Sequence, residues 1–83
     1  MHFRRLLRLE TRRNMASLFI EEIELRMPQQ HELEHLCESL SFQEERRLRF
    51  FINTENRAGV VNVCNDILKE TNRQLRQLLK VEG

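Results

Sequence analysis

Residues that interrupt helices are scarce in this sequence. Of its 83 residues, two are glycine and one is proline, while 40% are apolar and 33% are charged. This composition is typical of a compact helical domain and unlike that of a disordered segment. A chain of this length buries only roughly 60–65% of its unfolded surface. We therefore expect one helical domain over residues 1–83, without an active-site cleft between two lobes.

Long apolar runs and a cysteine framework are also missing. The longest apolar runs, such as Phe50-Phe51-Ile52, are a few residues long. A membrane-spanning helix or the apolar part of a signal peptide is longer. Cys37 and Cys64 form no CxxC pair, so we interpret both as small buried apolar residues rather than as halves of a disulfide. These features predict a cytoplasmic or nuclear protein that does not bind a membrane.

The charges lie in three blocks, although the net charge is only +1. Residues 1–13 have a balance of +4, residues 14–45 of −7 and residues 46–83 of +4. A uniformly basic stripe would indicate a phosphate backbone as partner. Separate patches of both signs favour a protein surface with the complementary pattern, which a second copy of the chain could supply.

Apolar residues recur at helical spacing almost throughout the chain. In the first segment, Phe3, Leu6 and Leu7 lie on one side and arginines lie opposite. From Met15 onward the apolar residues point about half a turn away. Because one straight helix cannot bury both faces against one core, we predict a kink or break within residues 11–14.

The later helices are predicted from their end signals. Pro28 should end the segment that begins at Met15, and a helix over roughly 29–40 should follow. Residues 41–44 read S-x-x-E, a capping box that starts another helix. Residues 53–56 are polar turn formers, and a broad apolar stripe begins at Val60.

A second possible capping box, Thr71-x-x-Gln74, predicts a separate last helix. The chain is thus predicted to be all-α, a compact antiparallel bundle of five helices, or six if the first counts as two pieces.

Residues 31–35, HELEH, match the H-E-x-x-H motif of zinc proteases, in which two histidines bind the metal and the glutamate is the general base. Helical spacing places His31 and His35 opposite Leu33 and Leu36, on the solvent face. The sequence predicts no sheet or dry cleft around them. A phosphate-binding glycine loop and a G-x-S-x-G motif are both missing. We predict no catalytic, metal or cofactor site, and no enzyme activity.

Residues 36–70, LCESLSFQEERRLRFFINTENRAGVVNVCNDILKE, resemble the middle of a caspase-recruitment domain (CARD). This family is a six-helix, Greek-key member of the death-fold superfamily. The junction L-[ST]-x-x-[DE] between its second and third helices is matched by Leu40-Ser41-x-x-Glu44. The N-terminal FRRLLRLETRRNMASLFI resembles the first helix of the family, which is kinked. The segment 15–28 is long for the family and the C-terminal part is short. Death-effector, pyrin and harmonin-homology domains are similar bundles.

The resemblance implies a non-enzymatic module that assembles a signalling complex, in innate immunity or apoptosis, through homotypic contact of oppositely charged faces. The partner would be another CARD or death-fold domain, or a second copy in a homo-oligomer or filament. The basic face would comprise Arg4, Arg5, Arg8, Arg12 and Arg13. The acidic face would comprise Glu32, Glu34, Glu38, Glu44 and Glu45. Phe50 is a candidate apolar anchor.

Two other functions are compatible with the sequence. The arginine-rich first helix could bind nucleic acid, although the acidic block and the lack of a helix-turn-helix glycine turn argue against it. A helical scaffold of the harmonin-homology type could instead hold a partner peptide in a groove.

Overall fold

The computed structural model describes residues 3–82, and side chains as far as residue 80. The helices are α1 (Phe3–Glu22), α2 (Gln30–Cys37), α3 (Phe42–Asn53) and α4 (Arg57–Glu82). The predicted all-α class is confirmed. The predicted number of five to six helices is wrong for the described residues, which form four, because both terminal segments fold as single long helices.

Helix α1 has no break at residues 11–14. Its buried positions, Leu9, Arg12, Ala16 and Phe19, recur every three or four residues and form one continuous stripe. The hydroxyl of Thr11 donates to the Leu7 carbonyl at 3.0 Å, so it bonds back into the helix instead of capping a new one. The break was predicted because the apolar residues at positions 3–7 point away from those beyond Met15. In the structure Phe3 and Leu7 remain exposed, so one straight helix does not have to bury both faces.

Helix α4 is also continuous across its predicted boundary. The Thr71 hydroxyl donates to the Ile67 carbonyl at 2.6 Å, within the helix, and Thr71 is fully buried. The predicted capping box at residues 71–74 therefore does not form. The buried residues of α4 continue through this point, from Ile67 to Leu75 and Leu78.

The boundaries of the two short helices agree better with the sequence. Ser41 caps α3 as predicted: its hydroxyl accepts from the Glu44 N–H at 3.2 Å, and the Glu44 carboxylate accepts from the Ser41 N–H at 2.9 Å. Helix α2 is shorter than the predicted 29–40. Pro28 lies in the linker before it, because α1 already ends at Glu22.

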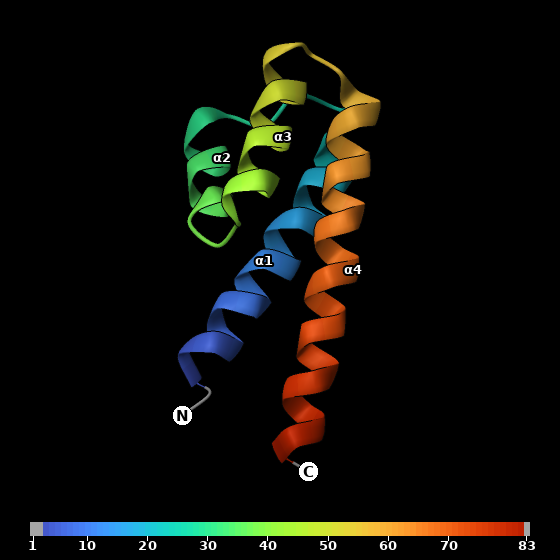
Figure 1. Ribbon diagram of the computed structural model, residues 1–83. Helices are drawn as coiled ribbons and strands as arrows, with labels where there is room; N and C mark the ends of the chain where they lie inside the picture. The colour runs from blue at the N-terminus through green and yellow to red at the C-terminus, as the bar shows by residue number, and fades with distance from the viewer. Residues whose placement is uncertain (1–2, 83) are drawn as a thin grey trace.

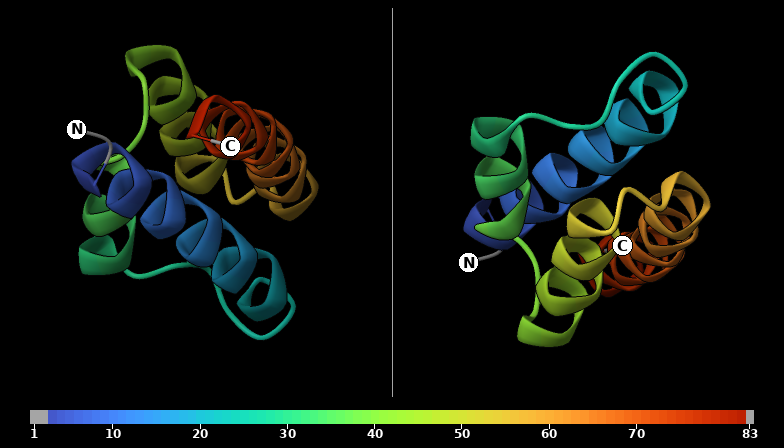
Figure 2. Two further views of the ribbon diagram at one scale, coloured as in Figure 1. Left: turned by 90° about the horizontal axis from the view of Figure 1, so that it is seen from below. Right: turned by 90° about the horizontal axis from the view of Figure 1, so that it is seen from above.

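Successive helices alternate in direction, so that α1 and α4 lie side by side and antiparallel (Figure 1). The molecule is elongated, with principal extents of 42 × 21 × 19 Å. Helices α2 and α3 lie beside only one end of the α1–α4 pair (Figure 1). Seen from below and from above, α2 lies next to α1 and α3 lies next to α4 (Figure 2). We call residues 14–68 the head. The α1 and α4 segments beyond it, residues 3–13 and 69–80, form the stalk.

Each part has its own apolar cluster. The head is built on a large cluster that includes Phe19, Leu36, Leu48 and Ile67, all nearly or fully buried. The stalk contains a small apolar cluster, in which Leu9 packs with Leu75 and Leu78 and with half-buried Leu6. Within residues 3–82, no helix combines the length and apolar character needed to cross a bilayer.

Candidate interaction surface

The structure divides the predicted basic face. Arg4, Arg5, Arg8 and Arg13 are exposed on the stalk part of α1, as predicted. Arg12 was predicted on the same exposed stripe, but its relative exposure is only 5%. The helical periodicity of α1 places Arg12 between Leu9 and Ala16 on the buried face, so it cannot be a surface contact in this fold.

Arg12 joins three helices through its guanidinium. Its Nε donates to the Thr71 hydroxyl of α4 at 2.9 Å, and one terminal nitrogen donates to the Ser39 carbonyl at 3.1 Å. Both terminal nitrogens donate to the Glu44 carboxylate of α3, each at 2.8 Å. This two-pronged pairing is the geometry in which arginine and carboxylate interact most strongly.

Glu44 was predicted on the acidic face, but its carboxylate faces inward to Arg12. Burial by itself would raise the pKa of Glu44; hydrogen bonds from Arg12 and from the Ser41 N–H outweigh it, and the pKa lies below its ordinary value. The same carboxylate thus caps α3 and neutralises the buried arginine. Arg12 and Glu44, assigned to opposite interface patches, bind each other within one molecule.

Two more acidic residues of the predicted face are engaged in surface ion pairs. Glu32 pairs with Arg26 at 2.9 Å, and the hydrogen bonds from Arg26 and from the Gln29 N–H lower the pKa of Glu32 to about 2. Glu45 pairs with Arg49 at 2.8 Å. Glu34 of α2 and Glu38, its C-cap residue, are exposed.

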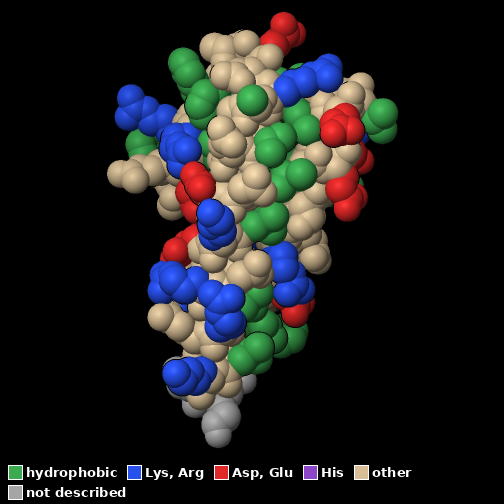
Figure 3. Space-filling view, turned by 90° about the vertical axis from the view of Figure 1, so that its right-hand side faces the viewer, with side chains coloured by type: hydrophobic (Ala, Val, Ile, Leu, Met, Phe, Trp, Pro, Cys, Tyr) green, Lys and Arg blue, Asp and Glu red, His purple; other side chains and the backbone are tan. Residues whose placement is uncertain are grey.

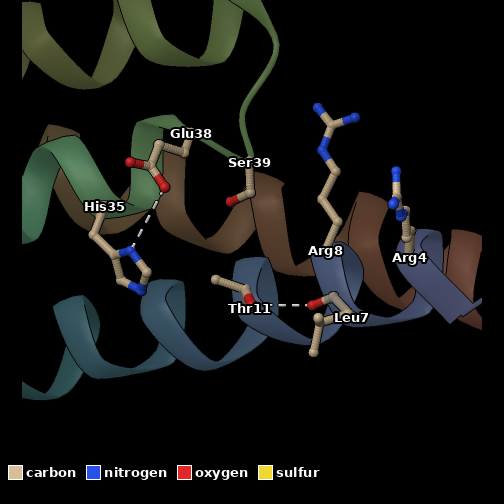
Figure 4. A pocket seen from close by; sticks show the side chains of 7 residues that line it. All are labelled: Arg4, Leu7, Arg8, Thr11, His35, Glu38 and Ser39. Atoms are coloured by element: carbon tan, nitrogen blue, oxygen red, sulfur yellow. Dashed lines mark hydrogen bonds and ion pairs between the residues drawn. The ribbon is translucent and has the colours of Figure 1, made fainter.

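Both histidines of HELEH lie on the solvent side of α2, which confirms their predicted placement. His35 Nδ1 is 3.9 Å from the Glu38 carboxylate. The side chains of His35 and Glu38 line an open groove of about 300 Å³ between α1 and α2, which we call the α2 groove (Figure 4). Figure 4 shows Arg4 and Arg8 projecting from α1 on the side of the groove that holds Ser39. Over residues 3–82 no three potential metal ligands come together.

The fold unites two basic segments that are far apart in the sequence. The stalk contains nine basic and two acidic residues, a balance of +7, whereas the head contains five basic and ten acidic residues, a balance of −5. Figure 3 shows basic side chains over the whole height of this face, whereas most of its acidic side chains lie in the upper part, so the lower part is mainly basic. The α4 half of this surface comprises Lys69, Arg73, Arg76 and Lys80. The sequence shows that both terminal blocks are basic, but they come together only because α1 and α4 pack antiparallel.

Apolar side chains are exposed in both parts. Phe50 is 60% exposed at the end of α3, where its ring contacts that of Phe51 edge to face with centroids 5.4 Å apart. On the stalk, Phe3, Leu7 and Leu79 are more than half exposed. Each could therefore contribute apolar contact area to a partner.

The two cysteines are not suited to nucleophilic chemistry. Cys64 is fully buried, and burial raises the pKa of its thiol to about 12. Burial also raises the pKa of half-buried Cys37. Since the thiolate is the reactive form, both thiols are in the unreactive state near neutral pH.

Comparisons of the chain with protein-family models, with curated proteins and with solved structures find no match. The surface of the described residues offers a partner a basic stalk, an acidic head and exposed apolar side chains on each.

Proposed function

We propose that this protein is a non-enzymatic interaction module in which the basic stalk of one copy binds the acidic head of the next. The observation that supports this proposal is the separation of charge along the long axis, +7 in the stalk against −5 in the head. Surfaces of opposite sign on different parts of one molecule are complementary between copies. Such a head-to-tail contact does not close on itself as a two-fold contact does, so it can propagate.

Charge alone would give a weak contact, because an exposed ion pair contributes only about 0–1 kcal/mol. Affinity would require several pairs together with a buried apolar anchor. Phe50 in the head and Phe3 and Leu7 in the stalk supply apolar area beside the charges. On the acidic side, Glu34 and Glu38 are the predicted residues whose carboxylates are exposed.

A narrower form of the proposal is that the contact is of the CARD type, in a signalling complex of innate immunity or apoptosis. It rests on the sequence resemblance alone. The described residues form four helices of alternating direction, which do not supply the six helices of that family. The broader proposal, a homotypic charge-driven module, does not depend on this family.

Self-association should increase with protein concentration and disappear as salt rises from about 0.05 M to about 0.5 M, because salt screens exposed charges. Light scattering coupled to size-exclusion chromatography measures it. A stalk variant, Arg4→Glu with Arg13→Glu, and a head variant, Glu34→Arg with Glu38→Arg, should each be monomeric.

Mixing the two variants gives the sharper result. The stalk variant keeps an intact head and the head variant keeps an intact stalk, so the mixture should form a one-to-one dimer that cannot grow. Arg46→Glu, an exposed charge reversal in the head, serves as the matched control and should leave assembly intact. A wild-type chain that stays monomeric at every concentration in low salt would contradict the proposal.

The scaffold alternative finds little support in the two grooves. The α2 groove, and a second groove between α1, α4 and Ser41, are lined mainly by charged and polar side chains. A groove that holds an amphipathic peptide is apolar.

Nucleic-acid binding is a second candidate, favoured by the union of two basic segments in the stalk. Binding of a labelled RNA or DNA duplex, followed by fluorescence anisotropy, should weaken steeply with salt. If both stalk helices contact phosphates, Arg76→Gln on α4 should reduce the slope of log K against log salt by about one. Arg46→Gln in the head should leave the slope unchanged. Absence of salt-dependent binding removes this candidate.

A further inference from the structure

Three arginines of α1 converge on the second groove, which we call the arginine groove. It has a volume of about 300 Å³ and lies where the stalk meets the N-terminal end of α3. Its lining comprises Arg5, Arg8, Leu9, Arg12, Ser41 and Gln74. Arg5 belongs to this groove alone, Arg4 lines only the α2 groove, and Arg8 lines both.

The arginine groove has a surplus of two positive charges. The charge of Arg12 is balanced by Glu44, with which it forms two hydrogen bonds. Arg5 and Arg8 are exposed. Among residues 3–80, no carboxylate oxygen lies within 4.0 Å of a guanidinium nitrogen of Arg5 or Arg8, so neither forms an ion pair there. Arg5 and Arg8 therefore bring two uncompensated charges to the lining of the groove, beside a third charge that is already neutralised.

The geometry around these arginines is also suited to an anion. Arg12 is fixed by four hydrogen bonds, so the wall it forms is rigid. Ser41, at the rim, is the N-cap of the twelve-residue α3, whose N-terminal end has a partial positive charge. The carboxylate of Glu44 already caps this helix end, so the site is defined by the arginines.

We propose that the arginine groove binds a phosphate monoester or inorganic phosphate. A phosphate monoester has a charge of about −1.5 to −2 at pH 7, which matches the surplus of two, whereas one carboxylate would neutralise half of it. The planar fork of arginine donates two parallel hydrogen bonds to phosphate oxygens. Arg5 and Arg8 also belong to the basic stalk of the proposed assembly, but phosphate binding by a single copy does not depend on that assembly.

Titration of the protein with inorganic phosphate and with a nucleoside monophosphate, followed by two-dimensional NMR at low salt, tests the site. Saturable shifts are expected at the backbone amides of Arg5, Arg8 and Ser41. Stronger binding of the nucleotide would identify an organic phosphate ester as the source, and equal binding would identify the free anion. Arg5→Gln should weaken binding about fivefold, the value of one exposed charged contact.

Two variants are matched controls, since each removes the same charge from the same helix without lining the groove. Arg4→Gln and Arg13→Gln should change the dissociation constant less than about twofold. Equal weakening by all three variants would show general attraction to the stalk and would overturn the proposal. So would shifts that do not saturate.

A pH series adds an independent check. The second pKa of a phosphate monoester is about 6, so binding of the nucleoside monophosphate should weaken between about pH 7.5 and 5.5, while binding of sulfate should not. Glu44 stays ionised in this window because its pKa is lowered. Sulfate keeps its charge over this range, so it controls for any change in the charge of the protein itself. Parallel weakening of phosphate and sulfate would contradict recognition of the phosphate dianion.

Discussion

Arg12→Met should lower the free energy of unfolding by about 3 kcal/mol, since removing one member of a buried ion pair leaves its partner charged and desolvated. Methionine is nearly as long as the buried arginine side chain, so the decrease in the free energy of unfolding reports the loss of the polar network rather than the creation of a cavity. Glu44 would lose both hydrogen bonds from Arg12, and the Ser39 carbonyl would lose its donor. Urea denaturation followed by circular dichroism gives the value.

The control for this prediction is Arg13→Met, which removes the same charge from the next, exposed position and should change stability by less than about 0.5 kcal/mol. A double-mutant cycle with Glu44→Gln isolates the pair. Glutamine can still accept from the Ser41 N–H, so the cap is largely kept. We expect a coupling energy of about 1.5 kcal/mol or more between positions 12 and 44. Additive effects would show that the two residues do not stabilise the fold as a pair.

The same network predicts how stability depends on pH. The folded pKa of Glu44 lies below its ordinary value of 4.5. A depressed carboxyl pKa stabilises the folded state above the unfolded pKa, and this contribution is lost as pH falls through the folded pKa. Thermal stability should therefore fall below about pH 4.5. The difference in stability between wild type and Arg12→Met should shrink over the same range, because a protonated Glu44 is neutral and is no longer a buried charge without a counter-ion.

Gly59→Ala should destabilise the protein by about 2 kcal/mol, although alanine is the better helix former by about 1 kcal/mol. Gly59 is buried in the first turn of α4, and its N–H donates to the Asn56 side chain at 2.9 Å. A Cβ at this position would lie within 2.7 Å of three ring carbons of Phe51, closer than real contacts allow. The Phe51 ring of α3 thus packs directly on the α4 backbone at Gly59.

The test of this explanation is a second substitution at the ring. Phe51→Ala removes the obstacle, so Gly59→Ala introduced into that variant should be neutral or stabilising. Thermal or urea unfolding of the four proteins completes the cycle. If Gly59→Ala costs the same in both backgrounds, the loss does not arise from the Phe51 ring.

Local features of the structure were predictable from the sequence. The capping box at Ser41 and Glu44 involves residues three apart, and the solvent-facing side of HELEH follows from helical spacing within one helix. The exposure of Phe50 was not predictable in this way. Helical spacing places it off the buried stripe of α3, but whether another helix covers it depends on the fold.

The sequence by itself determined that this chain is helical, where α3 begins and that its charges lie in blocks, because these follow from neighbours within a few residues. Only the tertiary structure decided that Arg12 is buried, since its partners Ser39, Glu44 and Thr71 lie 27, 32 and 59 residues away. The same buried side chain belongs to the continuous buried stripe of α1, where a break was predicted. Only the antiparallel packing of α1 on α4 joins the two basic blocks into one stalk, because a pattern of charge does not specify which helices pack together.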